Sequence, residues 1–305
     1  MVVVILLIVI QLVLIFLSVG VVTVVERKVL SFVQGREGPC QGLKGIVVFI
    51  LDYFKLVFKF GSFGGLFFSS MFCIFLLFCM VGLTPLSLLG FKGSFYNVLF
   101  VLILDVILVG VKYVVSDSYV SKMVEESSYR LRLSVLVVEL MFFFLIFPVV
   151  FSFLYLGASG WLEASCKVSF FFIFLEFFLF LLGLSLSLFQ VSRTPFDYFE
   201  GESEMVGGVL SHVGGGHFII WSFVEYLEIY FKSLLLVSVF FPFIIKYSFV
   251  FSILVIFLVL FFVLIRGLLP RLDYRSSIVY WVGGGFVVVF VLLLDFMFVL
   301  LRLVF

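Results

Sequence analysis

Charged residues are scarce in this sequence of 305 residues. Asp, Glu, Lys and Arg together make up 12%, whereas hydrophobic residues make up 65%. Soluble domains contain about 25% charged and about 45–50% apolar residues, and disordered chains combine low hydrophobicity with high net charge. The composition therefore argues against a soluble globular enzyme and against a disordered chain. The formal net charge of +1 predicts no nucleic-acid partner.

Residues that bind metals are also few. The chain has 4 Cys and 2 His, and none of the cysteines forms a Cys-x-x-Cys pair. This argues against a structural zinc site and against an iron–sulfur cluster held by this chain alone. Cys73 and Cys79 lie in an apolar run, so the cysteines do not form a disulfide framework. We expect no metal and no cofactor bound by this chain alone.

Ala, Thr and Asn are nearly missing, with 2, 3 and 1 residues, while Phe occurs 47 times and Gly 25 times. Amino acids with G- and T-rich codons are over-used, and those with A- and C-rich codons are scarce. This bias predicts that the gene lies in a strand-biased organellar genome.

Long apolar runs fill most of the chain. A membrane-spanning helix needs about 20 apolar residues, and the runs predict a polytopic all-α membrane protein, 1–305 forming one transmembrane domain. We expect about eight spans, near 3–25, 66–90, 97–115, 133–157, 168–190, 218–241, 247–265 and 277–300. The first run leads directly into Glu26-Arg27-Lys28, so it is interpreted as a retained span and not as a signal peptide.

The segment 46–60 is too short to span a membrane. Asp52, Lys55 and Lys59 are spaced so that they share one face of a helix, and apolar residues occupy the other positions. This pattern predicts an amphipathic helix that lies in the membrane interface. A fragment of the membrane core is the simpler alternative.

Basic residues predict the orientation of the chain. Four loops on one side, 26–60, 112–132, 191–217 and 266–276, hold 14 of the 19 Lys and Arg residues. The other side and the remaining span ends hold Lys92, Lys167, Lys232, Lys246 and Arg302. The first side is therefore predicted to be cytoplasmic or matrix, and its charged loops suggest that a large partner docks there.

The loop 191–217 is rich in acid and glycine. It contains Asp197, Glu200, Glu202 and Glu204, with Arg193 nearby. A solvated charged surface is the usual meaning of such a run. Otherwise some of these acids are protonated, or basic groups reach them from elsewhere in the fold.

Several acids lie inside predicted spans, where a charge is costly and each ionisable group is a functional candidate. The set comprises Asp105, Glu139, Glu176, Glu225, Glu228 and Asp295. For Asp105, Glu176 and Asp295 we favour simple pairing with a basic residue or a backbone amide. A carboxyl group at low dielectric favours its neutral form and can exchange a proton. For Glu139 and Glu225 we favour a functional role, because both belong to motifs that resemble a known family.

Specific motifs resemble one family in order along nearly the whole chain. The motifs are Glu26-Arg27-Lys28, Gln34-Gly-Arg36-Glu-Gly-Pro, Asp52-Tyr-Phe-Lys55, Arg130 with Glu139 nine residues later, Arg193-Thr-Pro-Phe-Asp197 with Glu200-Gly-Glu202-Ser-Glu204, Val-Glu225-Tyr226, and Arg266-Gly-Leu-Leu-Pro-Arg271-Leu-Asp273. These motifs resemble the family of chain 1 of NADH–ubiquinone oxidoreductase, the respiratory complex I. The family also has eight spans and a long polar face.

The resemblance implies a subunit of an enzyme that carries no redox centre itself. The chain would form much of the quinone-binding chamber where the membrane arm meets the peripheral arm. Ubiquinone would be the substrate, and NADH, FMN and iron–sulfur clusters would belong to partner subunits. The implied chamber and coupling residues are Glu26, Arg27, Gln34, Arg36, Asp52, Arg130, Glu139, Arg193, Asp197, Glu200, Glu202, Glu204, Glu225, Tyr226, Arg271 and Asp273.

The resemblance also implies a location and a set of partners. The chain would lie in the mitochondrial inner membrane with its charged loops on the matrix side. It would contact the peripheral-arm subunits of the quinone module, membrane chains 3, 6 and 4L, and lipids. Gln190 departs from the family, which usually has a Glu three residues before the Arg-Thr-Pro-Phe-Asp motif, and an amide cannot titrate there.

Other classes of protein remain as alternatives. A related membrane-bound hydrogenase uses a similar anchor subunit. A stand-alone secondary transporter would show internal symmetry or paired broken helices, which the sequence does not show. A purely structural anchor would explain the charged face but not Glu139 and Glu225 inside the spans.

Overall fold

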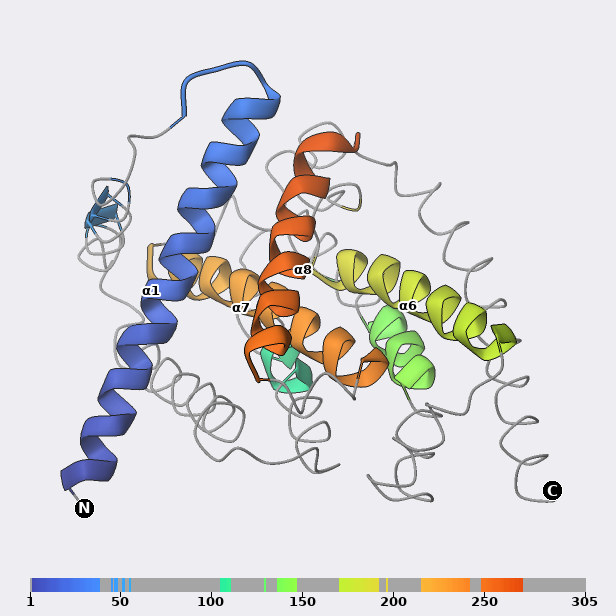
Figure 1. Cartoon of the computed structure of the whole chain (residues 1–305). Coiled ribbons are helices and arrows are strands. Elements are labelled where there is room, and N and C mark those ends of the chain that lie inside the picture. Colours follow the sequence, from blue (N-terminus) through green and yellow to red (C-terminus); the bar gives the residue numbers. More distant parts are fainter. Residues whose placement is uncertain are drawn as a thin grey trace.

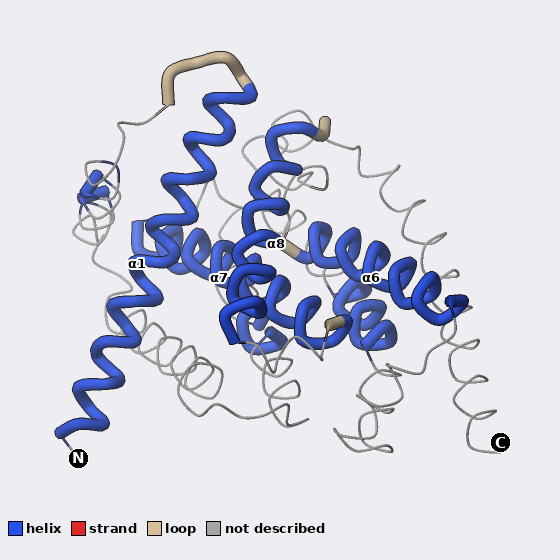
Figure 2. The backbone as a smooth tube through the Cα atoms, viewed as in Figure 1, coloured by secondary structure: helices blue, strands red, loops and turns tan. Residues whose placement is uncertain are grey.

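Helices form all of the regular structure in the described part of the chain. The computed structural model describes residues 2–38, 45, 47–48, 51–52, 55, 105–110, 129, 136–146, 170–191, 196, 215–241 and 248–270, and these contain no strand. Four long helices are α1 (Val2–Val33), α6 (Phe170–Gln190), α7 (Gly215–Phe240) and α8 (Ser248–Leu268) (Figure 1). Residues 105–110 and 136–146 are shorter helical segments, and Figure 2 shows the few described residues outside helices as short loops.

Helix α7 is the central helix of the described region. It packs against α1, α6 and α8. Along 221–240, every residue except Ser222, Tyr226 and Tyr230 is buried. A helix that is buried on all sides needs neighbours on all sides, so α7 holds the bundle together.

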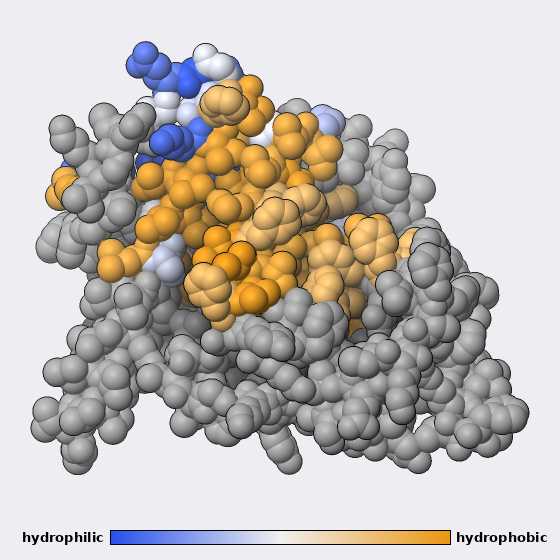
Figure 3. All heavy atoms as spheres, in the orientation of Figure 1, coloured by the Kyte–Doolittle hydropathy of each residue, from blue (hydrophilic) through white to orange (hydrophobic). Residues whose placement is uncertain are grey.

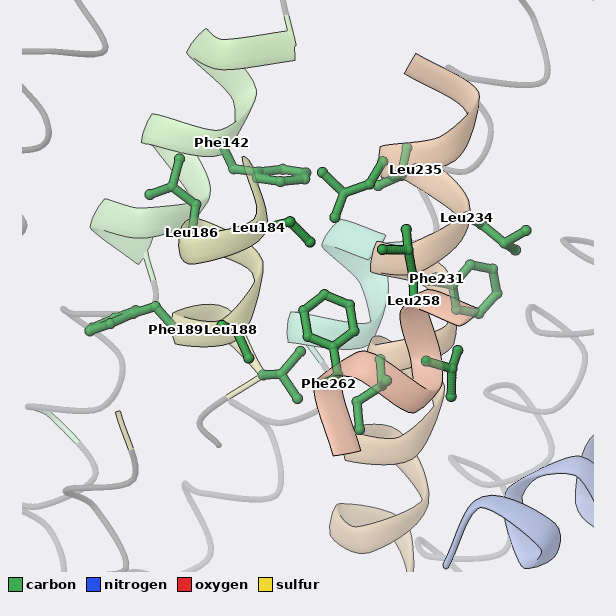
Figure 4. Close-up of a cluster of buried hydrophobic side chains, with 14 of the residues drawn as sticks. Phe142, Leu184, Leu186, Leu188, Phe189, Phe231, Leu234, Leu235, Leu258 and Phe262 are labelled. Carbon is green, nitrogen blue, oxygen red and sulfur yellow. The ribbon is translucent and has the colours of Figure 1, made fainter. Parts of the chain in front are cut away.

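The core lies where α6, α8 and the 136–146 segment meet α7. Figure 4 shows Phe142 pointing toward Leu235 of α7 across this core. The labelled core side chains are Phe142, Leu184, Leu186, Leu188, Phe189, Phe231, Leu234, Leu235, Leu258 and Phe262. These side chains make many van der Waals contacts with one another. This packing fixes how the helices lie against one another.

Helices α1 and α8 run side by side in the same direction. A Cβ placed on Gly267, near the end of α8, would lie 3.3 Å from Val33 Cγ2 at the end of α1. The eight-span prediction requires this arrangement, because the first and seventh spans cross in the same sense. Figure 1 shows both carboxyl-terminal ends at the top of the view.

Helix α1 ends in a Schellman motif. The Arg36 N–H donates to the Ser31 carbonyl at 2.9 Å, and the Gly35 N–H donates to the Phe32 carbonyl at 3.2 Å. Gly35 has φ 64°, in the left-handed region that a residue with a Cβ rarely adopts. The glycine of the Gln34-Gly-Arg36 motif therefore stops the helix and turns the chain.

The helix continues past the predicted end of the first span. The prediction ended that span near residue 25 and began a loop at Glu26, but residues 26–33 are helical. The helix extends beyond the predicted span, because Glu, Arg and Lys are good helix formers and do not end a helix. The first strong stop signal is Gly35.

The other described helices agree with their predicted spans. The spans predicted at 168–190, 218–241 and 247–265 correspond to α6, α7 and α8. Parts of the spans at 97–115 and 133–157 are helical, at 105–110 and 136–146. Described residues of the 46–60 segment are helical too, with Lys55 exposed and Asp52 half-buried. The spans at 66–90 and 277–300 lie outside the described residues.

The outer faces of the helices are as apolar as the inner faces. On α8 the exposed side chains include Phe249, Ile253, Ile256, Phe257, Leu260 and Leu264, and the buried ones include Val255, Leu258, Val259 and Phe262. A surface helix in water would carry polar residues on its outer face. Among the described residues, one helix, Phe249–Leu268, is long and apolar enough to cross a membrane. Its exposed face is suited to contact with lipid.

Hydroxyl groups within the helices bond to their own backbone. Thr23, Ser31, Ser185, Ser187, Ser233, Ser238 and Ser252 each donate to the carbonyl three residues earlier, at 2.7–3.0 Å. An unpaired hydroxyl in an apolar medium costs several kcal/mol. These local bonds let small polar side chains lie within membrane helices without partners on other helices.

Helices α6 and α7 approach closely at Gly183. A Cβ on Gly183 would lie 2.9 Å from Leu236 Cδ2 and 3.4 Å from Phe240 Cε2. Phe180, one turn earlier, packs edge-on against Phe240 with ring centroids 5.6 Å apart. The missing side chain at Gly183 therefore allows the two helices to fit together.

We expect Gly183→Val to destabilise the protein by about 1–3 kcal/mol, the usual cost of overpacking a core. The matched control is Gly110→Val, because a Cβ on the helical Gly110 meets no atom of the described residues within 4 Å. Both variants gain the same β-branched side chain in a helix, so their difference isolates the packing term. The measurement is the thermal unfolding midpoint of the purified protein in detergent, and equal midpoints for the two variants would contradict the close-approach interpretation.

Candidate functional site

A row of polar side chains runs along one buried face of α7. Trp221, Glu225, Glu228 and Lys232 are spaced by four, three and four residues, which places them on the same side of a helix. All four are at most 9% exposed, and Glu228 and Lys232 are fully buried. We call these four residues the α7 polar face. Buried charged side chains almost always have a partner of opposite charge or a hydrogen-bond partner.

Lys232 is paired with Asp105 across the core. The Lys232 ammonium donates to Asp105 Oδ2, and both side chains are almost completely buried. Lys232 Nζ also lies 4.1 Å from the centroid of the Phe142 ring, a cation–π contact. A fully buried ammonium group is thus neutralised by one carboxylate and covered by one aromatic face.

This ion pair confirms one prediction and overturns another. Asp105 was expected to pair with a basic residue, and it does. Lys232 was assigned to the opposite side of the membrane or a span end, which is wrong, since it lies eight residues before the end of α7 with no exposed surface. The count of basic residues in loops could not separate a lysine inside a span from one near its end.

Glu139 lies close to this ion pair. It belongs to the 136–146 segment, which also supplies Phe142, and it is within electrostatic reach of both Asp105 and Lys232. Its side chain is half-buried, and the Oε1 atom is buried with no hydrogen-bond partner among the described residues. Asp105 Oδ1 is buried and without a hydrogen bond in the same way. Two carboxyl groups therefore share the neighbourhood of one ammonium group.

Glu225 is held by its own helix. Trp221 lies one turn before Glu225 on α7, and its indole N–H donates to Glu225 Oε1 at 2.6 Å. Tyr226, the next residue, is half-buried. Glu225 and Lys232 are separated by two turns, which is about 10 Å along the axis at about 1.5 Å per residue. The α7 polar face thus extends the charged region from the Asp105–Lys232 pair toward the amino-terminal end of the helix.

A second ion pair joins α1 to α8. The Arg266 guanidinium donates to Glu26 Oε1, and the Glu26 side chain is 3% exposed. The sequence placed Glu26 in the first charged loop and Arg266 in the last one, on the same side of the membrane. The ion pair between them agrees with that common side. It fixes the ends of two helices that are 240 residues apart in the sequence.

Hydrophilic residues gather at this end of the described region. Arg27, Gln34 and Arg36 are all exposed near the carboxyl-terminal end of α1. Figure 3 shows the hydrophilic surface at the top of the view, above the orange apolar surface of the helices. The described region therefore has one polar end and apolar sides.

Gln190, at the end of α6, is fully buried, and neither its amide nitrogen nor its amide oxygen has a hydrogen-bond partner among the described residues. An amide without partners is costly to bury. The resembled family usually has a Glu at this position. Gln190 keeps the polar side chain without the charge.

Many of the predicted site residues lie outside the described part of the chain. These are Arg130, Arg193, Asp197, Glu200, Glu202, Glu204, Arg271 and Asp273. The described ones, apart from Asp52, fall into two groups. Glu26, Arg27, Gln34 and Arg36 lie at the polar end, and Glu139, Glu225 and Tyr226 lie on the central helices. Asp52 lies in the separate helical segment near residue 50.

Sequence reasoning missed Lys232 as a site residue. The signal was available, because Glu225, Glu228 and Lys232 are spaced as one face of a helix within a single predicted span. A basic residue in register with two acids inside a span indicates internal pairing. Its actual partner, Asp105, is 127 residues away, and no spacing rule could have identified it.

These features define the class of the described part of the chain: apolar helices, one of them able to cross a membrane, with paired charges between them. The sequence matches the NADH dehydrogenase family over residues 5–299. The chain belongs to this family.

Three similar proteins are all chain 1 of an NADH-ubiquinone oxidoreductase. It is 30% identical to NADH-ubiquinone oxidoreductase chain 1 of Apis mellifera ligustica over 280 residues, which cover 87% of each chain. It is 34% identical to the chain 1 of Paramecium tetraurelia over 234 residues, covering 74% of this chain and 88% of the relative. It is 31% identical to the chain 1 of Anopheles gambiae over 279 residues, covering 85% and 84%. The resemblance inferred from the motifs is thereby confirmed.

We expect Arg266→Gln to weaken the contact between α1 and α8 by about 1.5–3 kcal/mol, the usual worth of a hydrogen bond to a charged group. Arg266→Lys keeps the positive charge and should retain more than half of that stabilisation. The measurement is the thermal unfolding midpoint of the detergent-solubilised protein. A midpoint for Arg266→Gln equal to that of the unchanged protein would show that the ion pair does not stabilise these helix ends.

Proposed function

We propose that this chain is a core membrane subunit of an NADH:ubiquinone oxidoreductase and that it couples quinone reduction to proton translocation through its carboxyl groups. Its family and its relatives support membership in such a complex. The observation that carries the coupling role is the set of ionisable side chains buried between apolar helices. Such groups are costly in a membrane protein, and they commonly mark a path for protons or ions.

The polar end of the bundle is proposed to contribute to the quinone-binding chamber. Arg27, Gln34 and Arg36 are exposed there, and the Glu26–Arg266 pair holds the ends of α1 and α8 together beneath them. The loops 26–60, 191–217 and 266–276 would complete the chamber with Asp52, Arg193, the acids from Asp197 to Glu204, Arg271 and Asp273. Ubiquinone would bind there as the substrate.

The coupling role follows from the chemistry of quinone reduction. Two electrons and two protons convert a quinone to a quinol, so negative charge develops near the chamber until protons arrive. Buried carboxyl groups respond to such a change by exchanging a proton or by moving. Glu225 and Glu139 lie on adjoining central helices and are proposed to carry this response into the membrane, with Arg130 near the start of the fourth span.

The electron carriers are proposed to belong to other subunits. NADH, FMN and iron–sulfur clusters would be bound by the peripheral arm, which would dock on the charged loops of this chain. Membrane chains 3, 6 and 4L would contact its apolar sides together with lipids. The chain would lie in the mitochondrial inner membrane with its charged loops facing the matrix.

The coupling role predicts the effect of Glu139→Gln, which preserves volume and removes the titratable group. We expect NADH:quinone reductase activity per assembled complex to fall about tenfold or more, because a proton-transfer step typically contributes at least that much to a rate. The matched control is Glu163→Gln, an acid between the predicted spans 133–157 and 168–190 and outside the proposed chamber. Quinone reduction and proton translocation that both match the control would argue against a role for Glu139.

The assignment to the complex is tested by native electrophoresis of detergent-solubilised membranes. We expect this chain to appear by mass spectrometry in the band that stains for NADH dehydrogenase activity, together with iron–sulfur subunits. Migration with a hydrogenase would replace the quinone reductase with the related anchor role, and migration alone would favour a transporter.

A further inference from the structure

Three ionisable side chains from three separate helical segments lie near one another. Asp105 comes from 105–110, Glu139 from 136–146 and Lys232 from α7. Asp105 and Lys232 are at most 2% exposed and form a direct ion pair, and Glu139 is within electrostatic reach of both. We call these three residues the core triad. The motif resemblance assigned a role to Glu139 alone.

The charges of the core triad do not balance when both acids are ionised. Two carboxylates and one ammonium group leave one negative charge in the triad, of which Asp105 and Lys232 are buried and Glu139 is half-buried. Glu228, buried one turn before Lys232 on α7, adds a further acid on the same face and no positive charge. A net buried charge is expensive in the interior of a membrane protein. One additional proton makes the cluster neutral, so the triad is suited to hold one proton.

The hydrogen bonds of the triad are incomplete in a way that suits a shared proton. Lys232 has three N–H donors, one of which is used on Asp105 Oδ2, and the Phe142 ring covers the ammonium from another side. Asp105 Oδ1 and Glu139 Oε1 are both buried and accept no hydrogen bond among the described residues. Each of these two oxygens is therefore an available proton site.

A purely structural role explains the ion pair poorly. A buried ion pair is weak evidence for stability, because well-packed apolar side chains of similar volume do as well or better. The core around it already contains well-packed apolar residues such as Phe231 and Leu235. A third ionisable group beside the pair adds a further cost that only a functional gain would offset.

We propose that Asp105 and Lys232 are positioning residues for proton exchange at Glu139, and that the core triad holds one exchangeable proton. The ammonium group of Lys232 is paired with Asp105. It is therefore less available to stabilise Glu139 as a carboxylate. Because Lys232 is paired with Asp105, Glu139 is the group of the triad that takes up the proton, as an O–H group. Uptake and release of this proton change no oxidation state, so no oxidant or reductant is needed. This inference rests on the proposed function.

The first test is Asp105→Asn, which keeps the volume and the hydrogen-bonding oxygen but removes the charge. Glu139 then becomes the remaining carboxylate of the triad, and Lys232 should hold it ionised. We expect quinone reductase activity per assembled complex to fall about tenfold. A tenfold change in the ratio of protonated to ionised carboxyl group corresponds to one pKa unit. Asp105→Asn/Lys232→Met removes both charges and should recover activity to within about twofold of the unchanged complex. Glu163→Gln, outside the proposed chamber, is again the control.

A structural role predicts a different pattern. Asp105→Asn would then reduce the amount of assembled complex on native gels while leaving activity per assembled complex unchanged, and this result would overturn the proposal. Normal activity in Glu139→Gln would overturn the proposed function as well. An impaired Glu139→Gln with a normal Asp105→Asn would overturn only the role of the pair.

Infrared difference spectroscopy keeps the proposal testable where Asp105→Asn does not assemble. The carboxylic C=O band that is lost in Glu139→Gln belongs to protonated Glu139. We expect this band to shift in Asp105→Asn/Lys232→Met, because the two nearest charges are gone. An identical band in this double variant and in the unchanged complex would show that the pair does not influence Glu139.

Discussion

A charge inside a membrane protein must be compensated by the protein itself, because lipid provides neither counter-ions nor hydrogen bonds. The Lys232–Asp105 pair is where this constraint is strongest in the described region. Meeting it requires α7, the 105–110 segment and the 136–146 segment to come together, with Phe142 covering the ammonium group. The central position of α7 follows from the same requirement, since its buried acids and lysine can face only other helices.

The same constraint explains the remaining polar groups of the helices. Serine and threonine hydroxyls donate hydrogen bonds to carbonyls of their own helix, so they need no hydrogen-bond partner on a neighbouring helix. Glu26 and Arg266 pair where two parallel helices end together. Gly183 allows α6 to approach α7 closely at Leu236 and Phe240. Apolar side chains cover both the inside and the outside of this arrangement.

Much of the helical organisation could be predicted from hydrophobic runs. The bounds of α6, α7 and α8 agree with their predicted spans to within three residues at each end. The end of α1 could not be predicted in this way, because hydrophobicity stops at Val25 whereas helix propensity continues through Glu26, Arg27 and Lys28. The glycine that ends the helix was in the motif, but its structural role depends on a positive φ.

The sequence by itself determined the class of the protein, its family and the presence of ionisable groups within its helices. Composition and motif order are properties of the chain and need no folded structure. Only the tertiary structure decided which charges are partners. Asp105 pairs with Lys232 at a separation of 127 residues, and Glu26 pairs with Arg266 at a separation of 240. Helix periodicity relates residues within a few turns, whereas pairing between helices depends on how they pack around α7.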